Sequence, residues 1–426
     1  MSLDAQPICP QRIAVVGGGI SGLAAAYLLA PHHAVTLFEA APRLGGHART
    51  VLAGRRGDQP VDTGFIVFNY ANYPHLTRMF MELDVPVKPS DMSFGASIDN
   101  GRIEYALRSL RGLVAQHRNL ARPAFLRMVR DIATFNARAE AVANDDAMTI
   151  GDLIHTLRLG DWFRRYYLLP ICGAIWSTPP SAISDFPART LVQFFRNHAL
   201  LSARGQHQWW TVDGGSIEYV RRLEHHLRGR GVVIRMGAPV ASVARNGVES
   251  TVHVSGRSAE TFDQVIFACH SDQALSMLTH PTPQESAALS AIRYQDNTAV
   301  LHCDPALMPQ RPACWSSWVY NADTTQEAPA IGVTYWMNRL QGIPESDPLF
   351  VTLNPVREVA EDKIYDSTVF RHPIFDRAAI RAQSALRDLQ GANNTWFAGA
   401  YTRHGFHEDG FASGVRVARQ IDGQFA

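Results

Sequence analysis

The chain has 426 residues, of which 46% are apolar and 19% charged, a composition that excludes a disordered or fibrous chain and predicts two domains. Forty basic residues stand against 39 acidic ones, so the net charge of +1 provides no overall field for nucleic acid, and no nucleic-acid partner is expected. Only two of the basic residues are lysines, Lys88 and Lys363.

The first 40 residues predict a βαβ unit. Two short apolar runs, at 12–16 and 34–40, flank a glycine-rich turn and a helical segment that ends at Pro31. The uncharged stretch from Ile13 to Ala30 is long enough to suggest a membrane span or a signal peptide. Its glycines and the weakly basic leader before it favour a buried strand and helix instead.

The next part of the chain, residues 74–203, is expected to be mostly helical, with arginine-rich amphipathic stretches at 105–120 and 123–143. Beyond residue 205 short apolar runs replace the helical spacing. The elements predicted there are a helix at 214–227, strands between 232 and 269 and between 295 and 355, a helix at 377–390, a strand at 395–400 and a final helix at 411–421.

The predicted fold is α/β, with a discontinuous Rossmann domain joined to an α+β substrate domain made of an antiparallel sheet and helices. The Rossmann domain is expected to be discontinuous because nothing between residues 75 and 200 resembles a Rossmann unit. The predicted boundaries are 1–73, 205–275 and 391–426 for the dinucleotide-binding domain, and 74–204 and 276–390 for the substrate domain.

The cysteines and histidines show no metal-binding or disulfide pattern. Five cysteines, an odd number, are widely spaced and form no CxxC pair, which favours a reducing, cytoplasmic compartment. The 17 histidines include no HExxH or similar ligand spacing. No metal is therefore expected.

The strongest local motif is a dinucleotide fingerprint. Gly17, Gly19 and Gly22 form GxGxxG at the predicted strand-to-helix turn, and Glu39 closes the second strand 22 residues after Gly17. The glycines allow a tight turn and close approach of a pyrophosphate, to which the helix N-terminus adds its positive dipole. Glu39 is at the spacing that binds the ribose hydroxyls. The motif predicts a bound dinucleotide, either nicotinamide or flavin.

The residues after Glu39 favour flavin. The chain reads E-x3-R-x-G-G-x3-T, which contains Arg43, Gly45 and Gly46, and VDTGF follows at 61–65. GAPVASV, QWWTVDGGSIEYVRRL and FAGAYTRHGFHEDGFASG extend the pattern to the C-terminus. On these motifs the sequence resembles, from end to end, the large flavoprotein group that includes flavin amine oxidases, phytoene desaturases and protoporphyrinogen oxidase. The resemblance implies FAD as the cofactor.

The same resemblance implies roles for individual residues. The second glycine pair lies close to the FAD pyrophosphate in that group, and the acid-x-Gly segment reaches the isoalloxazine. The backbone of Val240 is implied to hold adenine, Gly399 to approach the phosphates and the N–H of His407 to donate to flavin O2. The full set of implied cofactor-binding residues is Gly17, Gly19, Ile20, Ser21, Gly22, Glu39, Ala40, Arg43, Gly45, Gly46, His47, Gly64, Phe65, Ile66, Val240, Gly399, Phe406 and His407.

We expect this FAD to be bound non-covalently. The flavin segment FAGAYTRHGFHEDG contains no cysteine, and no cysteine lies beyond Cys314 to form a thioether there.

A narrower resemblance concerns the substrate. DTGFIVFNYANYPHLTRMF, GAIWSTPP, VTYWMNRLQ and GFHEDG are similar to a bacterial branch of predicted NAD/FAD-binding proteins, often encoded beside cyclopropane-fatty-acid synthases. It implies a lipid acyl substrate, from which a desaturase or oxidase would remove a hydride. Trp176, Trp210 and Phe406 are expected in the substrate pocket, although core packing is the alternative for the tryptophans. No catalytic residue and no electron acceptor can be assigned.

The alternatives are a flavin amine oxidase and a non-redox flavin isomerase. Flavin amine oxidases usually present a lysine toward flavin N5 from the strand that corresponds to residues 296–299, and no lysine lies between Lys88 and Lys363. Phe406 stands where many of them place one tyrosine of an aromatic cage. A lipid-binding escort protein without flavin is disfavoured because the fingerprint glycines and Glu39 are intact.

Two further features of the sequence, an acidic pair near the C-terminus and an arginine-rich stretch, each allow two interpretations. Glu408 and Asp409 are expected in the first turn of the last helix, either as caps or as groups that position Arg43 or tune the flavin. Residues 105–130 hold six arginines and no acid, with leucines at helical spacing. Such a stretch forms either a solvated surface helix or a peripheral contact with the inner face of the membrane.

Overall fold

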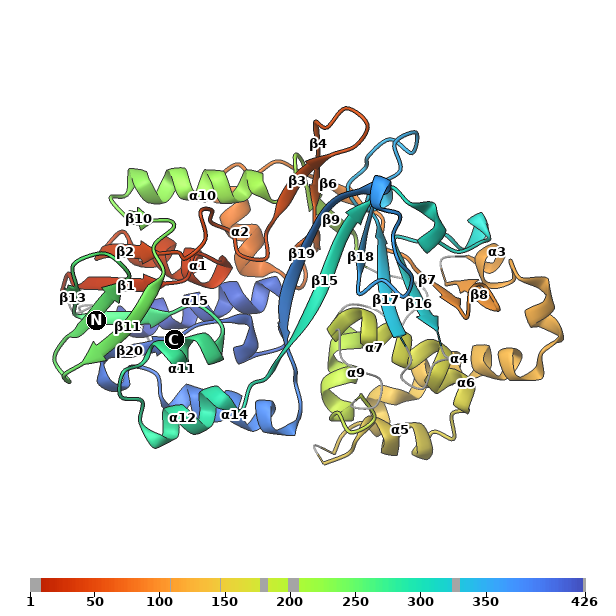
Figure 1. Cartoon of the computed structure of the whole chain (residues 1–426). Helices are drawn as coiled ribbons and strands as arrows, with labels where there is room; N and C mark the ends of the chain where they lie inside the picture. The colour runs from red at the N-terminus through yellow and green to blue at the C-terminus, as the bar shows by residue number, and fades with distance from the viewer. Residues whose placement is uncertain are drawn as a thin grey trace, which may run out of the picture.

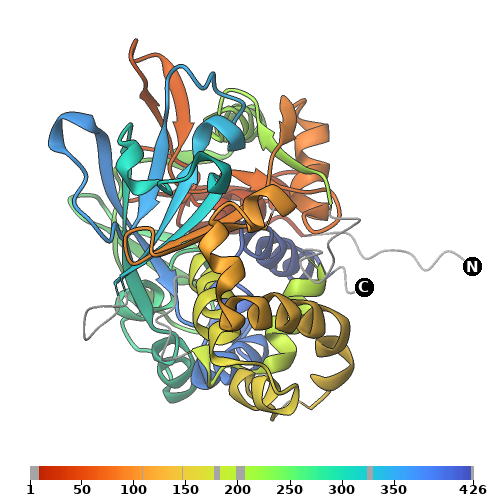
Figure 2. The ribbon, with the colours of Figure 1, turned by 90° about the vertical axis from the view of Figure 1, so that its right-hand side faces the viewer.

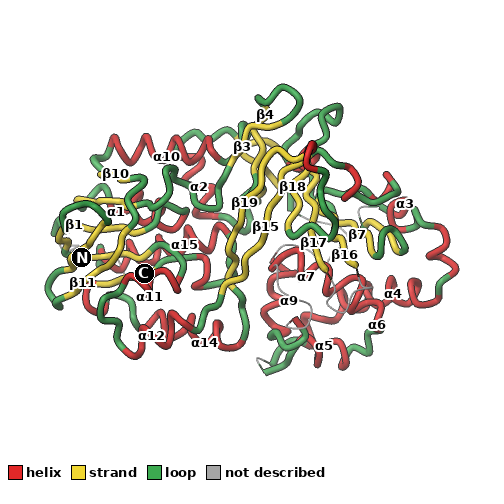
Figure 3. Tube along the Cα trace, in the orientation of Figure 1, coloured by secondary structure: helices red, strands yellow, loops and turns green. Residues whose placement is uncertain are grey.

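The structure is a computed structural model. It describes residues 9–107, 109–145, 147–176, 183–197, 207–323 and 330–423. A five-stranded parallel sheet and a seven-stranded, mainly antiparallel sheet dominate it. Figure 1 shows the parallel sheet on the left, and the long strands β15 and β19 between it and the rest of the larger sheet. In Figure 3 helices lie above and below the left-hand strands and cluster below the right-hand sheet.

The parallel sheet is assembled from three distant parts of the chain, which confirms the discontinuous Rossmann domain. Its strands lie in the order β10 (Val233–Arg235), β2 (Ala34–Phe38), β1 (Arg12–Val16), β14 (Gln264–Phe267) and β20 (Thr395–Phe397). Ile13 and Val15 of β1 face one apolar cluster, and Ala14 and Val16 face another. Burial on both faces explains the continuous apolar runs in these strands.

Helices cover both faces of this sheet. They are α1 (Ile20–Leu29), α10 (Ile217–Gly229) and α15 (His407–Ile421), together with α11 (Ser271–Met277), α12 (Pro283–Ser290) and α14 (Arg377–Asp388). Leu289 of α12 and Leu386 of α14 lie in one apolar cluster with Phe267 of β14. These two helices therefore pack with the dinucleotide-binding domain, although the predicted boundary gave residues 276–390 to the substrate domain.

The larger sheet combines strands from both halves of the chain. Its order is β19 (Ile364–Pro373), β15 (Tyr294–His302), β18 (Phe350–Leu353), β17 (Ala330–Trp336), β16 (Trp318–Asp323), β7 (Phe94–Ile98) and β8 (Ile103–Ala106). Strands β7 and β8 correct the prediction of a mostly helical segment from residue 74. Ser97 of β7 pairs with Glu104 of β8, and Glu104 is buried beside Arg311, so distant partners stabilise this hairpin.

Residues 105–120 do not form the predicted amphipathic helix. Strand β8 ends at Ala106, helix α3 (Leu110–Leu113) has one turn, and a 3-10 helix, η1 (His117–Ala121), follows. The break follows from the residues before α3, because the segment up to Ala106 pairs with β7, and the side chain of Ser109 then accepts from Gly112 N and starts a new helix. The other helices of this region are α4 (Pro123–Val142), α5 (Ile150–Thr156), α6 (Asp161–Phe163), α7 (Leu169–Trp176) and α9 (Ala188–Asn197).

The described ranges also contain three smaller sheets. The smaller sheets comprise β3 (Thr50–Ala53) with β4 (Gln59–Asp62), β11 (Val240–Arg245) with β12 (Ser250–Val254) and β13 (Glu260–Phe262), and β5 (Val67–Phe68) with β9 (Trp209–Val212) and β6 (Val87–Ser90). Two further helices are α2 (Pro74–Glu82) and α13 (Met337–Leu340). None of the helices in the described ranges has the length and apolar character needed to span a bilayer.

Candidate FAD site

The first glycine turn lies at the carboxyl end of the parallel sheet. Gly17 has φ +117°, and its N–H donates to Phe38 O at 2.8 Å. A Cβ on Gly17 would lie 2.6 Å from Ala268 O, and one on Gly22 only 1.9 Å from Gly17 O. Only glycine fits at these two positions, so β1, the turn and α1 are held in close contact.

The turn is open where a pyrophosphate is expected. Gly19 caps α1, which has no acidic residue in its first turn and receives no side-chain cap. A Cβ on Gly19 would meet nothing within 4 Å, so the space in front of the helix N-terminus is free. Unpaired N–H groups and open space at a helix N-terminus fit a phosphate group.

The second glycine loop lies against the first. Gly45 N donates to Gly18 O at 2.9 Å, and a Cβ on Gly46 would lie 3.1 Å from Gly19 Cα. The guanidinium of Arg43 donates to Gly46 O at 2.9 Å and to two further carbonyl oxygens of the loop at 3.2 Å. Arg43 therefore fixes the loop and adds positive charge beside the phosphate position.

Glu39 and Val240 meet at the other end of the site. The carboxylate of Glu39 accepts from Gly18 N and Ala41 N, both at 2.7 Å, and each oxygen keeps a lone pair for a ribose hydroxyl. Ala238 N donates to Glu39 O at 2.9 Å, which brings the start of β11, with Val240, beside Glu39. The structure thus places the predicted ribose and adenine contacts side by side.

The predicted isoalloxazine end is built from the 64–66 segment and the head of α15. Phe65 N donates to His47 O at 2.9 Å, and the ring of Phe65 stacks on His407 at 3.9 Å between centroids. His407 is the first residue of α15, and its ring hydrogen-bonds Tyr219 OH at 2.7 Å. These contacts hold the side chain of His407 aside and leave its backbone N–H at the helix N-terminus.

Four histidines gather around this end. The ring of His47 lies 5.6 Å from that of His372 and 6.0 Å from that of His270. Burial lowers the pKa of His47, lowers that of His270 to about 4, and lowers those of His372 and His407 to about 3. The four residues are half-buried, and their rings are neutral at pH 7. We call these four residues the histidine cluster.

A chain of amides sets the tautomer of one member. Asn354 Nδ2 donates to Asn297 Oδ1 at 2.8 Å, which orients the Asn297 amide so that its Nδ2 donates to His372 Nδ1 at 3.1 Å. The neutral ring of His372 therefore carries its proton on Nε2. Asn297 stands on β15 within the segment 296–299, where flavin amine oxidases usually have lysine.

Asp62 connects several elements of the site through hydrogen bonds, a role that was not predicted from the sequence. Its buried carboxylate accepts from the N–H and hydroxyl of Ser216, from Thr50 Oγ1 at 2.6 Å and from Gln341 Nε2 at 2.9 Å. Burial raises its pKa to about 6, and the hydrogen bonds oppose this rise. Asp62 thereby fixes the start of the 64–66 segment to α10 and α13.

The two acids of α15 act as caps. Asp409 accepts from Phe406 N at 3.0 Å within its own helix start. Glu408 accepts from His75 N at 2.9 Å and Leu76 N at 3.0 Å, so it caps a different helix, α2. Burial raises the pKa of Glu408 to about 7. Arg43 hydrogen-bonds the glycine loop rather than either acid.

Several predicted residues contribute backbone or packing. Ile20 and Ser21 face α15, where a Cβ on Gly410 would lie 2.8 Å from Ile20 Cγ2 and 3.0 Å from Ser21 Oγ. Ala40 is exposed beside Glu39, and Ile66 is buried. Gly399 lies two residues beyond β20, and its N–H donates to Ser413 Oγ at 2.9 Å.

The predicted substrate-pocket residues fall in separate places. Trp210 packs against the dinucleotide-binding core and contacts Tyr70, with ring centroids 5.6 Å apart. Phe406 packs against the cluster of the helical region. Trp176 ends α7, and its side chain lies outside the described part of the chain. A shared pocket of these three residues stays a prediction.

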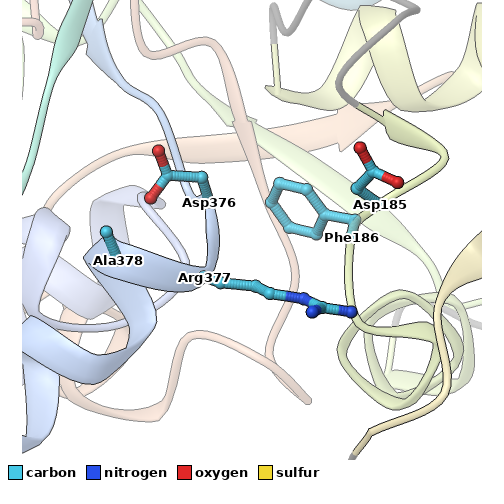
Figure 4. A pocket seen from close by; sticks show the side chains of 5 residues that line it. All are labelled: Asp185, Phe186, Asp376, Arg377 and Ala378. Carbon is cyan, nitrogen blue, oxygen red and sulfur yellow. The ribbon is translucent and has the colours of Figure 1, made fainter.

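A surface pocket lies elsewhere. A hollow of about 300 Å³ at the start of α14 is lined by Asp185, Phe186, Asp376, Arg377 and Ala378. Figure 4 shows the side chains of these five residues. None of the predicted site residues lines this hollow. In the described ranges no three or more His, Cys, Asp and Glu side chains are grouped as metal ligands.

The fold and the paired glycine loops define a dinucleotide-binding protein, and the family match identifies it as an FAD-dependent oxidoreductase. The sequence matches the flavin containing amine oxidoreductase family over residues 20–304, and the chain belongs to this family. It is 52% identical, over an alignment of 470 residues, to an L-amino-acid oxidase of Crotalus adamanteus, with 97% of this chain and 87% of that protein covered.

Two solved structures share the fold at low sequence identity. A putrescine oxidase variant is 15% identical with a TM-score of 0.68, and 98% of this chain and all of that chain are covered. A fatty acid isomerase from P. acnes that produces CLA is 15% identical with a TM-score of 0.67, with coverage of 96% and 98%.

Proposed function

We propose that this FAD-dependent oxidoreductase oxidises an amine or amino acid at the carbon next to nitrogen. Family membership and the similarity to an L-amino-acid oxidase support this substrate class. The observation that carries the proposal is the similarity to an L-amino-acid oxidase over 97% of this chain, and the closely spaced, uncharged rings of the histidine cluster suit that chemistry. The sequence-based preference for an acyl substrate becomes the second candidate.

A neutral site suits amine oxidation for a physical reason. Burial disfavours a charged imidazolium, and the same burial disfavours a charged ammonium bound at that place. An amine that loses its proton regains the nitrogen lone pair, which weakens the adjacent C–H bond toward hydride loss. FAD, when bound, supplies the acceptor for that hydride.

The chain's own groups would hold and shield the reacting carbon. The stacked pair of Phe65 and His407 and the ring of His47 provide flat, uncharged surfaces that exclude water. His372 has its proton on Nε2 and accepts from Asn297 at Nδ1, so neither ring nitrogen is assigned as a base. The N–H of His407 at the head of α15 would stabilise negative charge on the reduced cofactor.

The second candidate is oxidation of an apolar acyl chain. It is favoured by Asn297 and Thr298 in the segment where flavin amine oxidases usually have lysine, and by Phe406 in place of a cage tyrosine. A fatty acid isomerase shares the fold, so a non-redox outcome at an acyl chain is included in this candidate.

Anaerobic reduction of the holoprotein distinguishes the candidates. We expect amino acids or amines to bleach the visible flavin band, with tighter apparent binding as pH rises and the free base becomes abundant. Fatty acids and phospholipids form the matched second panel, and product analysis of that panel detects isomerisation. Bleaching or isomerisation with acyl substrates alone would replace the first candidate by the second.

A further inference from the structure

One end of the helical region carries exposed leucines among arginines. Leu110 is 79% exposed, Leu126 49% and Leu120 45%, and with Leu107 they make up four of the twelve large apolar side chains exposed in the described ranges. Arg111, Arg118 and Arg122 alternate with them along the chain. Figure 2 looks onto this end, where the orange segment with α3 and α4 crosses the front. The arginine–leucine surface is defined here as Leu110, Leu120, Leu126, Arg111, Arg118 and Arg122.

The local fold presents these side chains in a fixed arrangement. Arg118 Nη2 donates to the carbonyl oxygens of Gly101 at 2.9 Å and Arg102 at 2.8 Å, and Arg122 Nη1 reaches the same Arg102 oxygen at 3.4 Å. The acceptors of these bonds are neutral carbonyl oxygens and not carboxylates, so the bonds do not compensate the positive charge of either guanidinium group. The short helices α3 and η1 therefore sit firmly on the β7–β8 turn.

The surface is positively charged on a molecule that is almost neutral overall. Residues 109–131 contain five arginines and one acid, Asp131. The buried carboxylate of Asp131 lies 3.1 Å from Arg130 and 3.6 Å from Arg127, and accepts from Gly160 N at 2.7 Å. Asp131 thus compensates part of the charge of Arg127 and Arg130. The other three arginines, Arg111, Arg118 and Arg122, give this surface its excess of positive charge.

Exposed leucines beside uncompensated arginines fit one kind of partner. Nucleic acid would satisfy the arginines and leave the leucines in water, whereas a bilayer offers phosphate groups and an apolar layer within the same few ångströms. We propose that the arginine–leucine surface docks on an anionic lipid bilayer, with its leucines in the headgroup region and its arginines on lipid phosphates. This docking is independent of which substrate the FAD site oxidises.

Vesicle sedimentation of the FAD-loaded full chain tests the proposal. We expect binding to phosphatidylcholine vesicles that contain phosphatidylglycerol, weak binding to phosphatidylcholine alone, and a decrease with added salt. Arg111→Gln should weaken binding about fivefold, the effect of one basic residue near such a surface. Arg118 and Arg122 are left intact because they also hold the fold.

The leucines distinguish a bilayer from any other polyanion. Leu110→Gln with Leu126→Gln should weaken vesicle binding about 10-fold or more. The matched control is Met81→Gln with Val248→Gln, two side chains that are 65% and 80% exposed on other parts of the molecule. Retained flavin absorbance confirms that each variant is folded. Equal, negligible binding to both vesicle types overturns the proposal. So does binding, to vesicles and to heparin alike, that depends on Arg111 but not on the leucines.

Discussion

At the scale of single residues, Glu39 provides the sharpest test of the cofactor site. Its carboxylate is held by two backbone N–H groups at 2.7 Å, so its position for the ribose is set before FAD binds. Glu39→Gln should weaken FAD binding roughly 10- to 100-fold, the loss of a charge-assisted hydrogen-bond pair of about 1.5–3 kcal/mol. Fluorescence titration of the apoprotein with FAD measures it.

The control for this titration is Glu361→Gln, which removes an equal charge from an exposed position in a short 3-10 helix. It should leave FAD affinity unchanged. Equal effects of the two variants would show that net charge, and not the position of Glu39, governs binding.

Residues whose role depends on their neighbours in the sequence could be predicted. Residues whose role depends on contacts with distant parts of the chain could not. The glycines at 17, 19 and 22 follow from a turn whose whole geometry lies within a few residues. Asp62 acquires its role from Ser216 and Gln341, more than 150 residues away, and nothing near Asp62 indicates that contact. The pairing of Asn297 with His372 was missed for the same reason.

At the scale of elements, the contact between α15 and α1 depends on Gly414. A Cβ there would lie 2.6 Å from Ser21 O and 2.9 Å from Ala24 Cβ. Gly414→Ala should lower the free energy of unfolding by about 2 kcal/mol, because the helices must move apart. Urea unfolding measures this. Gly229→Ala, in α10 where a Cβ meets nothing within 4 Å, should be neutral or slightly stabilising. Equal stability of the two variants would contradict the described packing.

Helix α2 depends on a cap supplied from the other end of the chain. Glu408→Ala removes the acceptor of two N–H groups at the start of α2 and should cost about 1–2 kcal/mol of stability. Hydrogen exchange should quicken in residues 74–82, and Glu408→Gln, which keeps one acceptor oxygen, should have a smaller effect. Unchanged exchange in α2 with Glu408→Ala would rule out the capping role.

Helices and strands with a strong apolar pattern were predicted correctly. Elements whose structure depends on pairing or packing with distant residues were not. Strands β1, β2 and β14 read directly from their apolar runs. Strand β19 was missed because it is an edge strand with mostly exposed or half-buried residues, and its pairing with β15 defines it. The helix predicted at 105–120 was wrong because its first residues pair with β7 and Ser109 caps a new, short helix.

At the scale of the whole molecule, the buried histidines predict acid sensitivity. Burial lowers the pKa of His270 and His302 to about 4 and of His372 and His407 to about 3, so the unfolded chain binds more protons than the folded chain between pH 4 and 6.5. Stability is present above that range and is lost as pH falls through it, by about 1.4 kcal/mol per pH unit for each histidine.

Three acids oppose this trend. Asp62 and Glu408, with raised pKa values of about 6 and about 7, stabilise the fold as pH falls, and so does Asp409, whose pKa burial also raises. They are outnumbered by the four histidines. Urea unfolding at pH 7 and pH 5 should therefore show a lower free energy of unfolding at pH 5. His302→Gln, away from the FAD site, should reduce the difference, and a higher stability at pH 5 would contradict the neutral histidines.

Three distant chain segments form one FAD site that ends at the histidine cluster. An experimental structure of the FAD complex is the decisive measurement. We expect the pyrophosphate at Gly19 and Gly46, the ribose on Glu39, and the isoalloxazine beside His47 and His372 with the N–H of His407 at its O2. An isoalloxazine placed away from the histidine cluster, or a cofactor in the hollow at Arg377, would contradict it.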